Sequence, residues 1–524
     1  MKPVRQTLLA GGAVLAALAL AGAAAAQDQT QDQTLRVGIN APEIKTLDPH
    51  RASATTEKGP MGWMFNGLVR FPPGSADPAD LEPDLAESWT SNEDGTEWTF
   101  TLREGVRFHG DWGNLTAADV VYSLERAKDP ERSSFAAAYS AFKTIEALDE
   151  RTVRIVLDHP VPGFLGLLSN YHGGNIVSKA AAEAAGADFG KAPVGTGPFA
   201  FSEYATQQQV VFTANPDYFR GAPKIGRIEY RLIPADASRE LAFTSGELDL
   251  IYGKREQRWI ERWARDDNAV VDVFWPAEYR TLHLNTTMEP LTDKRVREAV
   301  ARAINIDEIV SFVGEDVGPK GCSVVPSGYL GEDCSAWTYS YDPEAAKALL
   351  AEAGFANGVT IKSVVSSTNA QLPIMEVIQA QLAQSGITLD MQVVDHPTYH
   401  EMIRKDLSGA TFYGAARFPI ADTYLTEFYH SDAIVGKPTA ITNFSHCAVA
   451  DAPINAAKTQ TDPQKQLAEW SEAQRLIHQE ICAVPLFNLR QVWLRSDKLD
   501  YGYELEGAMN LAPPITELTQ LKAE

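Results

Sequence analysis

The sequence predicts an α/β protein with at least two domains. Its 524 residues exceed what one hydrophobic core usually serves. Strand-like and helical patterns alternate through residues 359–365, 374–382 and 388–394, and such alternation is typical of an α/β arrangement. These patterns alone predict several α/β domains.

Residues 1–26 are predicted to be a secretory signal peptide. Lys2 and Arg5 precede an apolar stretch at 8–20, and three alanines end the segment at Ala26. The apolar stretch is too short for a comfortable membrane span. A lipoprotein would need a cysteine at the cleavage point, and the first cysteine is Cys322. We therefore expect an exported chain that is free in a periplasm and is not a lipoprotein.

The charge balance limits the partners of the chain. The formal net charge is -23, and loss of Lys2 and Arg5 with the leader would make it -25 (-23 - 2). Such an acidic surface argues against nucleic acid and against anionic lipid headgroups as partners. It does not identify a ligand.

Local patterns in the first half predict strands and a helix. Residues 35–39 are expected to form an opening strand. Apolar residues alternate with threonines over 98–102, and residues 92–95 upstream supply hairpin-turn chemistry. Thr116 can cap a helix that has Asp119 near its positive end. The apolar stripe of that helix is formed by Val120, Val121 and Leu124.

The second half predicts two more helices. Asp293 can cap the first of them, and its apolar positions recur at helical spacing as Val296, Val300, Ala303 and Ile304. The second has Pro343 in its first turn and Gly354 as its stop. Glycines and prolines at 193–199 mark a turn, and no Walker lysine follows them, so we do not expect a nucleotide site there.

Several blocks of sequence carry a family resemblance. AESW, DGTEWTFTLREGVRFH and LTAADVVYSLERA follow one another between residues 81 and 127. This order resembles the signature of the bacterial extracellular solute-binding proteins of family 5, which serve dipeptide, oligopeptide and nickel ABC importers. TLDPH at 46–50, SGELD at 245–249 and the stretch 285–307 resemble further blocks. The resemblance covers essentially the whole mature chain.

The resemblance implies a fold and a function. The fold would be the α/β two-lobed periplasmic-binding-protein (Venus flytrap) fold with mixed sheets, a cleft between the lobes and an extra subdomain at about 76–190. Lobe one would hold residues 34–285 and 485–524, and lobe two residues 286–484. The protein would be a monomer without a cofactor that delivers a solute to an inner-membrane ABC permease and its ATPase. Closure of a hinge around the ligand would signal to the transporter.

One expected cleft segment departs from the family pattern. Relatives carry a block there that resembles Gly-Trp-x-x-Asp, and in peptide binders the aspartate of this block pairs with the α-ammonium of the ligand. In residues 413–425 Arg417 takes the place of the aspartate, and no tryptophan occurs. Arginine offers planar donors to a carboxylate, a phosphate or sugar hydroxyls and repels an ammonium group. The alternative is that Arg417 pairs with Asp422 or another acid.

A second expected cleft segment is neutral. Dipeptide-binding relatives use an arginine near residues 365–372, where this chain has Ser366, Ser367, Thr368 and Asn369. We therefore predict a small polar or anionic solute or a peptide-like ligand. The predicted contacts are Arg417, Phe418, Asp422, Tyr413, Tyr424, Thr46, Trp63, Ser367, Asn369 and Asn443. For the aromatic residues, ordinary core packing is the competing interpretation.

Four cysteines in an exported chain favour two disulfides. Three pairings are possible, and we favour Cys322 with Cys334 and Cys447 with Cys482. No CxxC spacing suggests zinc.

The remaining candidates for chemistry are few. His396 and His400 are four residues apart, but Pro397 between them disfavours a regular helix, so we expect surface histidines and no metal site. The sequence contains no GxSxG elbow and no cysteine in the setting of an activated nucleophile, so neither of these motifs indicates an enzyme. The alternative functions are an exported hydrolase or a sensory binding protein on the same scaffold. A turnover assay separates the hydrolase from a binding protein, which returns its ligand unchanged.

Overall fold

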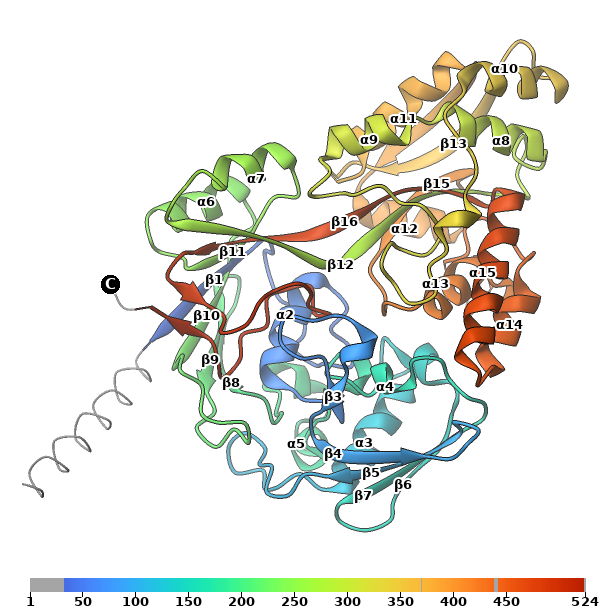
Figure 1. The fold of residues 1–524 in the computed structure, drawn as a ribbon. Helices are drawn as coiled ribbons and strands as arrows, with labels where there is room; N and C mark the ends of the chain where they lie inside the picture. The colour runs from blue at the N-terminus through green and yellow to red at the C-terminus, as the bar shows by residue number, and fades with distance from the viewer. Residues whose placement is uncertain (1–32, 369, 438–441, 523–524) are drawn as a thin grey trace, which may run out of the picture.

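The computed structural model describes residues 33–368, 370–437 and 442–522. Its largest sheet is mixed and has eight strands, in the order β15-β12-β16-β11-β1-β10-β9-β8 (Figure 1). The predicted signal peptide lies outside the described residues and stays a prediction.

The strands of the structure are β1 (Thr34–Ile39), β2 (Val69–Arg70), β3 (Glu82–Pro83), β4 (Ala86–Ser91), β5 (Glu97–Leu102), β6 (Phe142–Ala147), β7 (Thr152–Leu157), β8 (Phe199–Ala205), β9 (Gln209–Ala214), β10 (Arg227–Leu232), β11 (Leu250–Tyr252), β12 (Ala269–Leu284), β13 (Val359–Ser366), β14 (Ile387–Val394), β15 (Ala410–Ala415), β16 (Ala483–Ser496), β17 (Leu499–Asp500) and β18 (Gln520–Leu521).

The α-helices are α2 (Thr55–Met64), α3 (Ala117–Lys128), α4 (Phe164–Leu167), α5 (Lys179–Ala185), α6 (Asp236–Thr244), α7 (Gln257–Trp263), α8 (Lys294–Ala303), α9 (Ile306–Val313), α10 (Pro343–Glu352), α11 (Leu372–Gln384), α12 (His396–Arg404), α13 (Ala421–Tyr429), α14 (Asp451–Thr459) and α15 (Pro463–Glu480). We call β1–β11, β17 and β18 with α2–α7 lobe one, and β13–β15 with α8–α15 lobe two.

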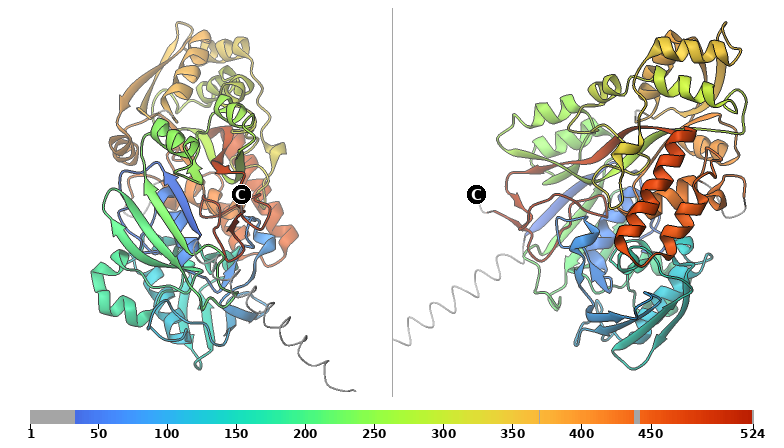
Figure 2. Two further views of the ribbon diagram at one scale, coloured as in Figure 1. Left: turned by 90° about the vertical axis from the view of Figure 1, so that its left-hand side faces the viewer. Right: turned by 45° about the vertical axis from the view of Figure 1, so that its right-hand side comes forward.

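Two long antiparallel strands, β12 and β16, run through both lobes (Figures 1 and 2). The first half of β12 pairs with the end of β16 beside β11, whereas its second half pairs with the start of β16 and with β15. The register shifts between Phe274 and Glu278, so the irregularity lies where the chain passes from one lobe to the other. This arrangement confirms the predicted two-lobed α/β fold with mixed sheets.

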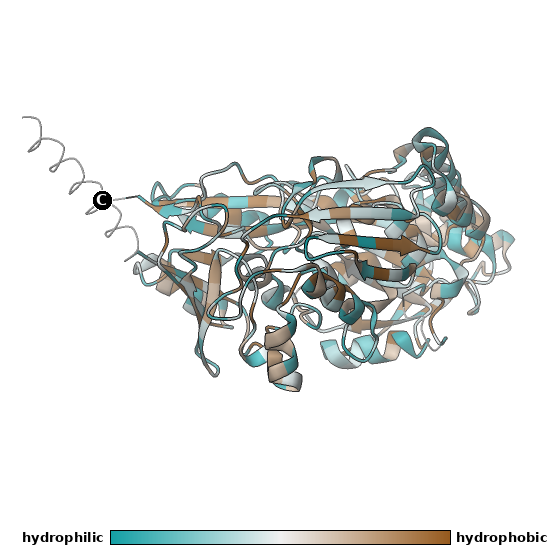
Figure 3. Ribbon diagram, turned by 90° about the horizontal axis from the view of Figure 1, so that it is seen from below, coloured by the Kyte–Doolittle hydropathy of each residue, from teal (hydrophilic) through white to brown (hydrophobic). Residues whose placement is uncertain are grey.

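The family-signature block at 81–127 supplies β4, β5 and α3 to a four-stranded antiparallel sheet in the order β4-β5-β7-β6. As predicted, β4 and β5 are joined by a turn, in which the amide of Gly95 donates to the carbonyl of Asn92 at 3.2 Å. The amide of Thr116 donates to Oδ2 of Asp119 at 3.0 Å, which closes the predicted cap of α3. In Figure 3 hydrophobic and hydrophilic residues are interleaved along the strands. None of the described helices is long and apolar enough to cross a membrane.

Helix α3 fixes the TLDPH loop through a buried ion pair. Both nitrogens of the Arg126 fork donate to Asp48, and the two side chains are 6% and 5% exposed. Nη1 of Arg126 also lies 2.8 Å from Nδ1 of His50, whose pKa burial and the Arg126 charge lower to about 4. The two sequence motifs are therefore one structural unit.

We expect Arg126→Ala to destabilise the fold by about 3–5 kcal/mol, because it leaves the Asp48 carboxylate buried without its partner. Denaturant unfolding measures the difference. The control is Lys191→Ala, which breaks an ion pair whose side chains are 79% and 69% exposed and should change stability by about 0–1 kcal/mol. Equal effects of the two substitutions would contradict this reading of the motif.

The predicted elements of the second half are present. Asp293 Oδ1 accepts from the amide of Arg295 at the start of α8, and Pro343 begins α10. Strand β13, helix α11 and strand β14 follow in order, and β13 pairs with β14 in parallel. Their apolar residues join one core with α8 and α9.

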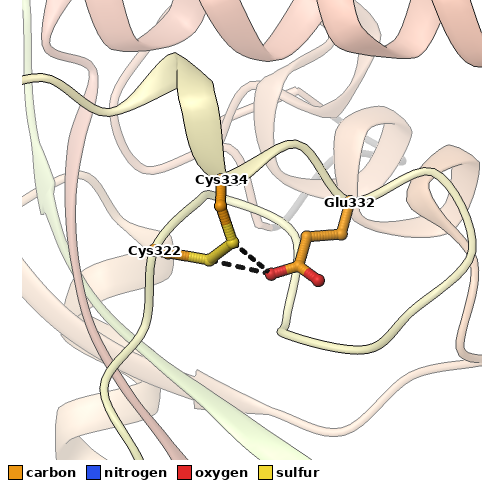
Figure 4. Close-up of side chains that lie close together, drawn as sticks. All are labelled: Cys322, Glu332 and Cys334. Atoms are coloured by element: carbon orange, nitrogen blue, oxygen red, sulfur yellow. Dashed lines mark hydrogen bonds between the residues drawn. A yellow bond between two sulfur atoms is a disulfide. The ribbon is translucent and has the colours of Figure 1, made fainter.

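Both favoured disulfides, Cys322–Cys334 and Cys447–Cys482, are formed. Oε1 of Glu332 lies 2.8 Å from Sγ of Cys322 and 2.9 Å from Sγ of Cys334 (Figure 4). Burial raises the pKa of Glu332 above its ordinary value. Among the described residues these three form the one group of His, Cys, Asp or Glu close enough to share a metal, and the disulfide removes both thiolates.

Candidate ligand cleft

A cavity of about 360 Å³ lies between the lobes. Lobe one contributes α2 and the segment around β11, the strand β12 contributes its second half, and lobe two contributes α12, β15 and the residues before α11. The lining residues are Asn40, Thr55, Thr56, Tyr252, Arg255, Glu278, Arg280, Thr368, Ala370, Gln371, His396, His400, Tyr413 and Gly414.

Glu278 stands between two arginines of the cavity wall. Arg255 and Arg280 both donate to its carboxylate. Burial would raise the pKa of Glu278, but the two guanidinium groups outweigh burial and hold it at about 2. Nη2 of Arg255 also donates to the hydroxyl of Tyr252 and to Oε1 of Gln491, at 2.7 Å each. One carboxylate is thus shared by two cations.

Arg280 lies flat on Gly414, its direct neighbour across the β12–β15 pair. A Cβ at position 414 would lie 2.6 Å from Cζ and 2.7 Å from Nε of Arg280. The missing side chain therefore makes the room that the guanidinium occupies. Within the described part of the chain, Nε of Arg280 and Nε of Arg255 are buried without a hydrogen-bond partner.

Lys58 and Arg417, which are not among the cavity-lining residues, lie close enough for their charges to act on one another. Lys58 follows Thr56 by two residues on α2, and its Nζ lies 5.6 Å from the centre of the Tyr171 ring. Burial and the charge of Arg417 lower the pKa of Lys58 to about 8. Nε of Arg417 donates to Glu427 at 2.5 Å. Burial alone would lower the pKa of Arg417, but the Glu427 carboxylate outweighs it and the pKa is raised.

Phe418 brings the lobes into direct contact. Its ring centre lies 6.0 Å from that of Phe71 in lobe one. A Cβ added at Gly166 of α4 would lie 1.9 Å from Cζ of Phe418, and one at Gly163 would lie 3.1 Å from its Cε1. These two glycines make a notch for the ring, so the structure is a closed arrangement of the lobes.

The residues predicted from the 413–425 segment fall in three places. Tyr413 lines the cavity, whereas Arg417 is not among its lining residues. Arg417 pairs with Glu427 and not with Asp422. The surroundings of Asp422 are Lys458 and Trp470 in lobe two, and burial raises its pKa to about 6.

The other aromatic and polar residues predicted from sequence have structural contacts. The hydroxyl of Tyr424, which is fully buried, accepts from the amide of Arg417 at 3.0 Å. Trp63 packs edge-on against Phe212 and Tyr230 in the core of lobe one.

Three more predicted residues, Thr46, Ser367 and Asn443, lie outside the cavity lining. Oγ1 of Thr46 accepts from the amide of Asp48 at 3.0 Å. The amide of Ser367 donates to Val394 at 2.8 Å, and its neighbour Thr368 lines the cavity. Nδ2 of Asn443 donates hydrogen bonds to the carbonyls of His430 and Cys447. Asn369 lies outside the described residues.

The expectation of surface histidines fits His396, which is exposed, and His400, which is partly exposed, but the expectation that Pro397 disfavours a regular helix there is wrong. Helix α12 begins at His396 with Pro397 in its first turn, where a proline removes no helical hydrogen bond. The two Nε2 atoms lie 3.1 Å apart, and both side chains line the cavity. Burial and the charge of His396 lower the pKa of His400 to about 4, so it is neutral at pH 7.

The sequence interpretation also missed Arg255, Glu278, Arg280 and Gln371. The sequence did contain a pattern that could have identified two of these residues, Glu278 and Arg280. Glu278 and Arg280 are two residues apart in a stretch with strand-forming residues, so they share one face of a strand. Opposite charges on one face, close to a Trp-Pro step at 275–276, could have marked the wall of a site.

Two lobes joined by a pair of shared strands, with a charged cavity between them, define the class of periplasmic binding proteins. The model of the bacterial extracellular solute-binding proteins, family 5 Middle, matches residues 80–435. The chain belongs to this family.

Relatives and solved structures agree with this membership. The chain is 30% identical over 509 residues to di/tripeptide-binding protein 2 of Pseudomonas aeruginosa, covering 90% of this chain and 92% of that protein. It is 29% identical to the glutathione-binding protein GsiB of Escherichia coli K12, covering 95% and 98%. The structure of MoaA of A. tumefaciens R10 in complex with mannopinic acid is 49% identical, with a TM-score of 0.86 and coverage of 94% and 100%.

The family membership gives the general function. Family 5 proteins are the periplasmic or extracellular solute-binding components of ABC importers, and they work with a permease. The relatives are solute-binding proteins and not enzymes.

Proposed function

We propose that this chain captures a small anionic solute between its lobes for import. The observation that carries the proposal is the charge of the cleft. Two arginines, Arg255 and Arg280, and one carboxylate, Glu278, line the cavity and give its wall a charge of +1 (2 - 1), while Lys58 and Arg417 lie near the carboxylates Glu57 and Glu427. In a chain of net charge -23, a positive cleft favours an anion.

An opine-type acid is a better candidate than a simple peptide. Mannopinic acid is the ligand of the 49% identical structure, and an acid fits the cationic groups described above. Mannopinic acid is therefore the first compound to test.

The finer features of the protein belong to the same proposal. Lobe one would comprise residues 34–285 and 485–524, lobe two 286–484, and the extra subdomain about 76–190. The position of β12 and β16 in both lobes supports boundaries near 285 and 485. We further propose a leader cut after Ala26, a free periplasmic monomer without a lipid anchor, and an inner-membrane permease with its ATPase as partners. The predicted ligand contacts Arg417 and Tyr413 remain part of the proposal.

Calorimetry and thermal unfolding test the proposal. Mannopinic acid, glutathione, dipeptides and neutral sugars are compared on the mature protein. A true ligand at 100 times its Kd should stabilise the fold by about 2.7 kcal/mol and raise Tm. If no acid in the panel shifts Tm, the anionic assignment fails. If the ligand is recovered chemically changed, the hydrolase is the better function.

Lys58 should make binding depend on pH. In the free protein its pKa is about 8, and a bound anion would raise it by stabilising the charged form. Affinity should be constant below pH 8 and fall by up to tenfold per pH unit as pH rises above 8, until the pKa of the bound state is passed. Calorimetry in buffers of different ionisation enthalpy should show proton uptake on binding near pH 8.5. The variant Lys58→Met should lose this uptake, and its persistence would assign the proton to another group.

A further inference from the structure

Helix α12 brings two imidazoles together at the wall of the cavity. Nε2 of His396 and Nε2 of His400 lie 3.1 Å apart, and both residues line the cavity. Neither imidazole has a role in the proposed anion binding. We propose that they form a chelating pair for a late first-row divalent transition metal ion, with Cu²⁺ bound most tightly.

The distance between the two nitrogens fits one shared metal ion. Histidine nitrogens bind such an ion at about 2.0–2.1 Å. Two nitrogens at that distance, with an angle of about 90–110° at the metal, are separated by roughly 2.8–3.4 Å. The observed separation of 3.1 Å lies in this range, so binding would need only a small movement of the two rings.

The helix backbone holds the pair in place. Residues four apart lie on one face of a helix, and α12 is helical from His396 to Arg404, with Asp395 as its cap and Pro397 in its first turn. The expectation of no metal site depends on Pro397 interrupting the helix, and the proline does not interrupt it. Ligands on a regular element keep their geometry better than ligands on a loop.

Ser366 orients the ring of His396. Oγ of Ser366 lies 3.0 Å from Nδ1 of His396, and Ser366 is fully buried at the end of β13. The same hydroxyl donates to Oγ1 of Thr368 at 3.3 Å, so its oxygen is free to accept from Nδ1. An imidazole that donates through Nδ1 keeps the lone pair of Nε2 for a metal.

The cavity would supply the rest of the coordination. Among the described residues no third His, Cys, Asp or Glu is close enough to join the pair, so the other positions of the ion would be open to water or to an oxygen ligand in the cavity. Arg280 and Glu278 act on His396 with charges of opposite sign. Because these charges partly cancel at the pair, the arginine does not by itself prevent a dication from binding.

A hydrogen bond between the two rings is the competing explanation of the contact. In a pair of neutral imidazoles, the N–H of one ring can donate to the lone pair of the other at this distance. The two explanations differ in one measurable property, because only a chelating pair binds a metal ion with both rings at once.

Copper titration of the mature protein, without an affinity tag and without added solute, tests the pair. The Cu²⁺ affinity measured by calorimetry should fall at least tenfold in His396→Gln and in His400→Gln. In the unmodified protein Mn²⁺ should bind more weakly than Cu²⁺, as the stability order of divalent ions requires. Electron paramagnetic resonance of the copper complex should show two histidine nitrogens bound to the ion, and one in each variant.

Two controls separate chelation from the number of histidines. His400→Gln combined with Glu401→His keeps the histidine count but turns the second imidazole by about 100° around α12, so it should bind Cu²⁺ as weakly as His400→Gln. Glu401 is exposed, and so is His159 in the extra subdomain; His159→Gln should leave the affinity unchanged. If His400→Gln or the shifted variant binds Cu²⁺ as tightly as the unmodified protein, the contact is only a hydrogen bond and the inference is wrong. Mannopinic acid is absent throughout, so that result would leave the proposed anion binding untouched.

Discussion

Gly166→Val is expected to weaken solute binding on the order of 100-fold while leaving each lobe folded. In the closed structure even a Cβ at this position would lie 1.9 Å from Cζ of Phe418, a contact that cannot form. The backbone of Gly166 is not in the left-handed region, so valine adds no strain there. The lobes would have to stay apart. If the closed form falls to about 1% of the population, the apparent Kd rises about 100-fold.

A second substitution tests whether the steric contact is the cause. Phe418→Ala removes the ring that the notch receives, so Gly166→Val combined with Phe418→Ala should bind more tightly than Gly166→Val alone. Calorimetry gives the affinities, and small-angle scattering shows whether ligand still makes the molecule more compact. Gly95→Ala is no fair control because Gly95 has φ of 64°; Ala138→Val, in an exposed position of the same subdomain, should leave affinity unchanged. Normal binding by Gly166→Val would show that closure does not need this contact.

Local patterns were sufficient for much of the fold and for little of the site. The hairpin at 92–95, the caps at Thr116 and Asp293 and the helix start at Pro343 depend on neighbours in sequence, and each was found. The pairing of Arg126 with Asp48 joins residues 78 apart. The TLDPH motif and the block at 81–127 were both recognised in the sequence, but the contact between them was not predicted.

The cavity wall depends on strand register between distant segments. Arg280 has its place because β12 pairs it with Gly414, and no periodicity in either strand reveals that register. The ion-pair partner of Arg417 could not be predicted from local sequence either. Helix α13 begins at Ala421, so Asp422 and Glu427 are five residues apart and lie on different sides of the helix. Only Glu427 points back to Arg417.

Arg417→Ala should have the largest effect of any single change of charge in the cleft. Truncating one partner of a hydrogen-bonded charge pair in an interface costs about 2–5 kcal/mol, which is roughly 30-fold to several thousand-fold in Kd. Part of that loss would come from Glu427, whose carboxylate would remain near the solute and repel it. Calorimetry with mannopinic acid measures the change.

The role of Arg417 follows from three variants and not from one. If Arg417 holds the solute, Glu427→Gln should preserve or improve affinity, because the guanidinium loses a competing acceptor. Arg417→Ala combined with Glu427→Gln should then recover the part of the loss due to repulsion, but not the part due to the missing anchor. If Arg417 serves only to satisfy Glu427, the double variant should regain full affinity. The size of the loss that remains in the double variant is therefore the direct contribution of Arg417 to solute binding.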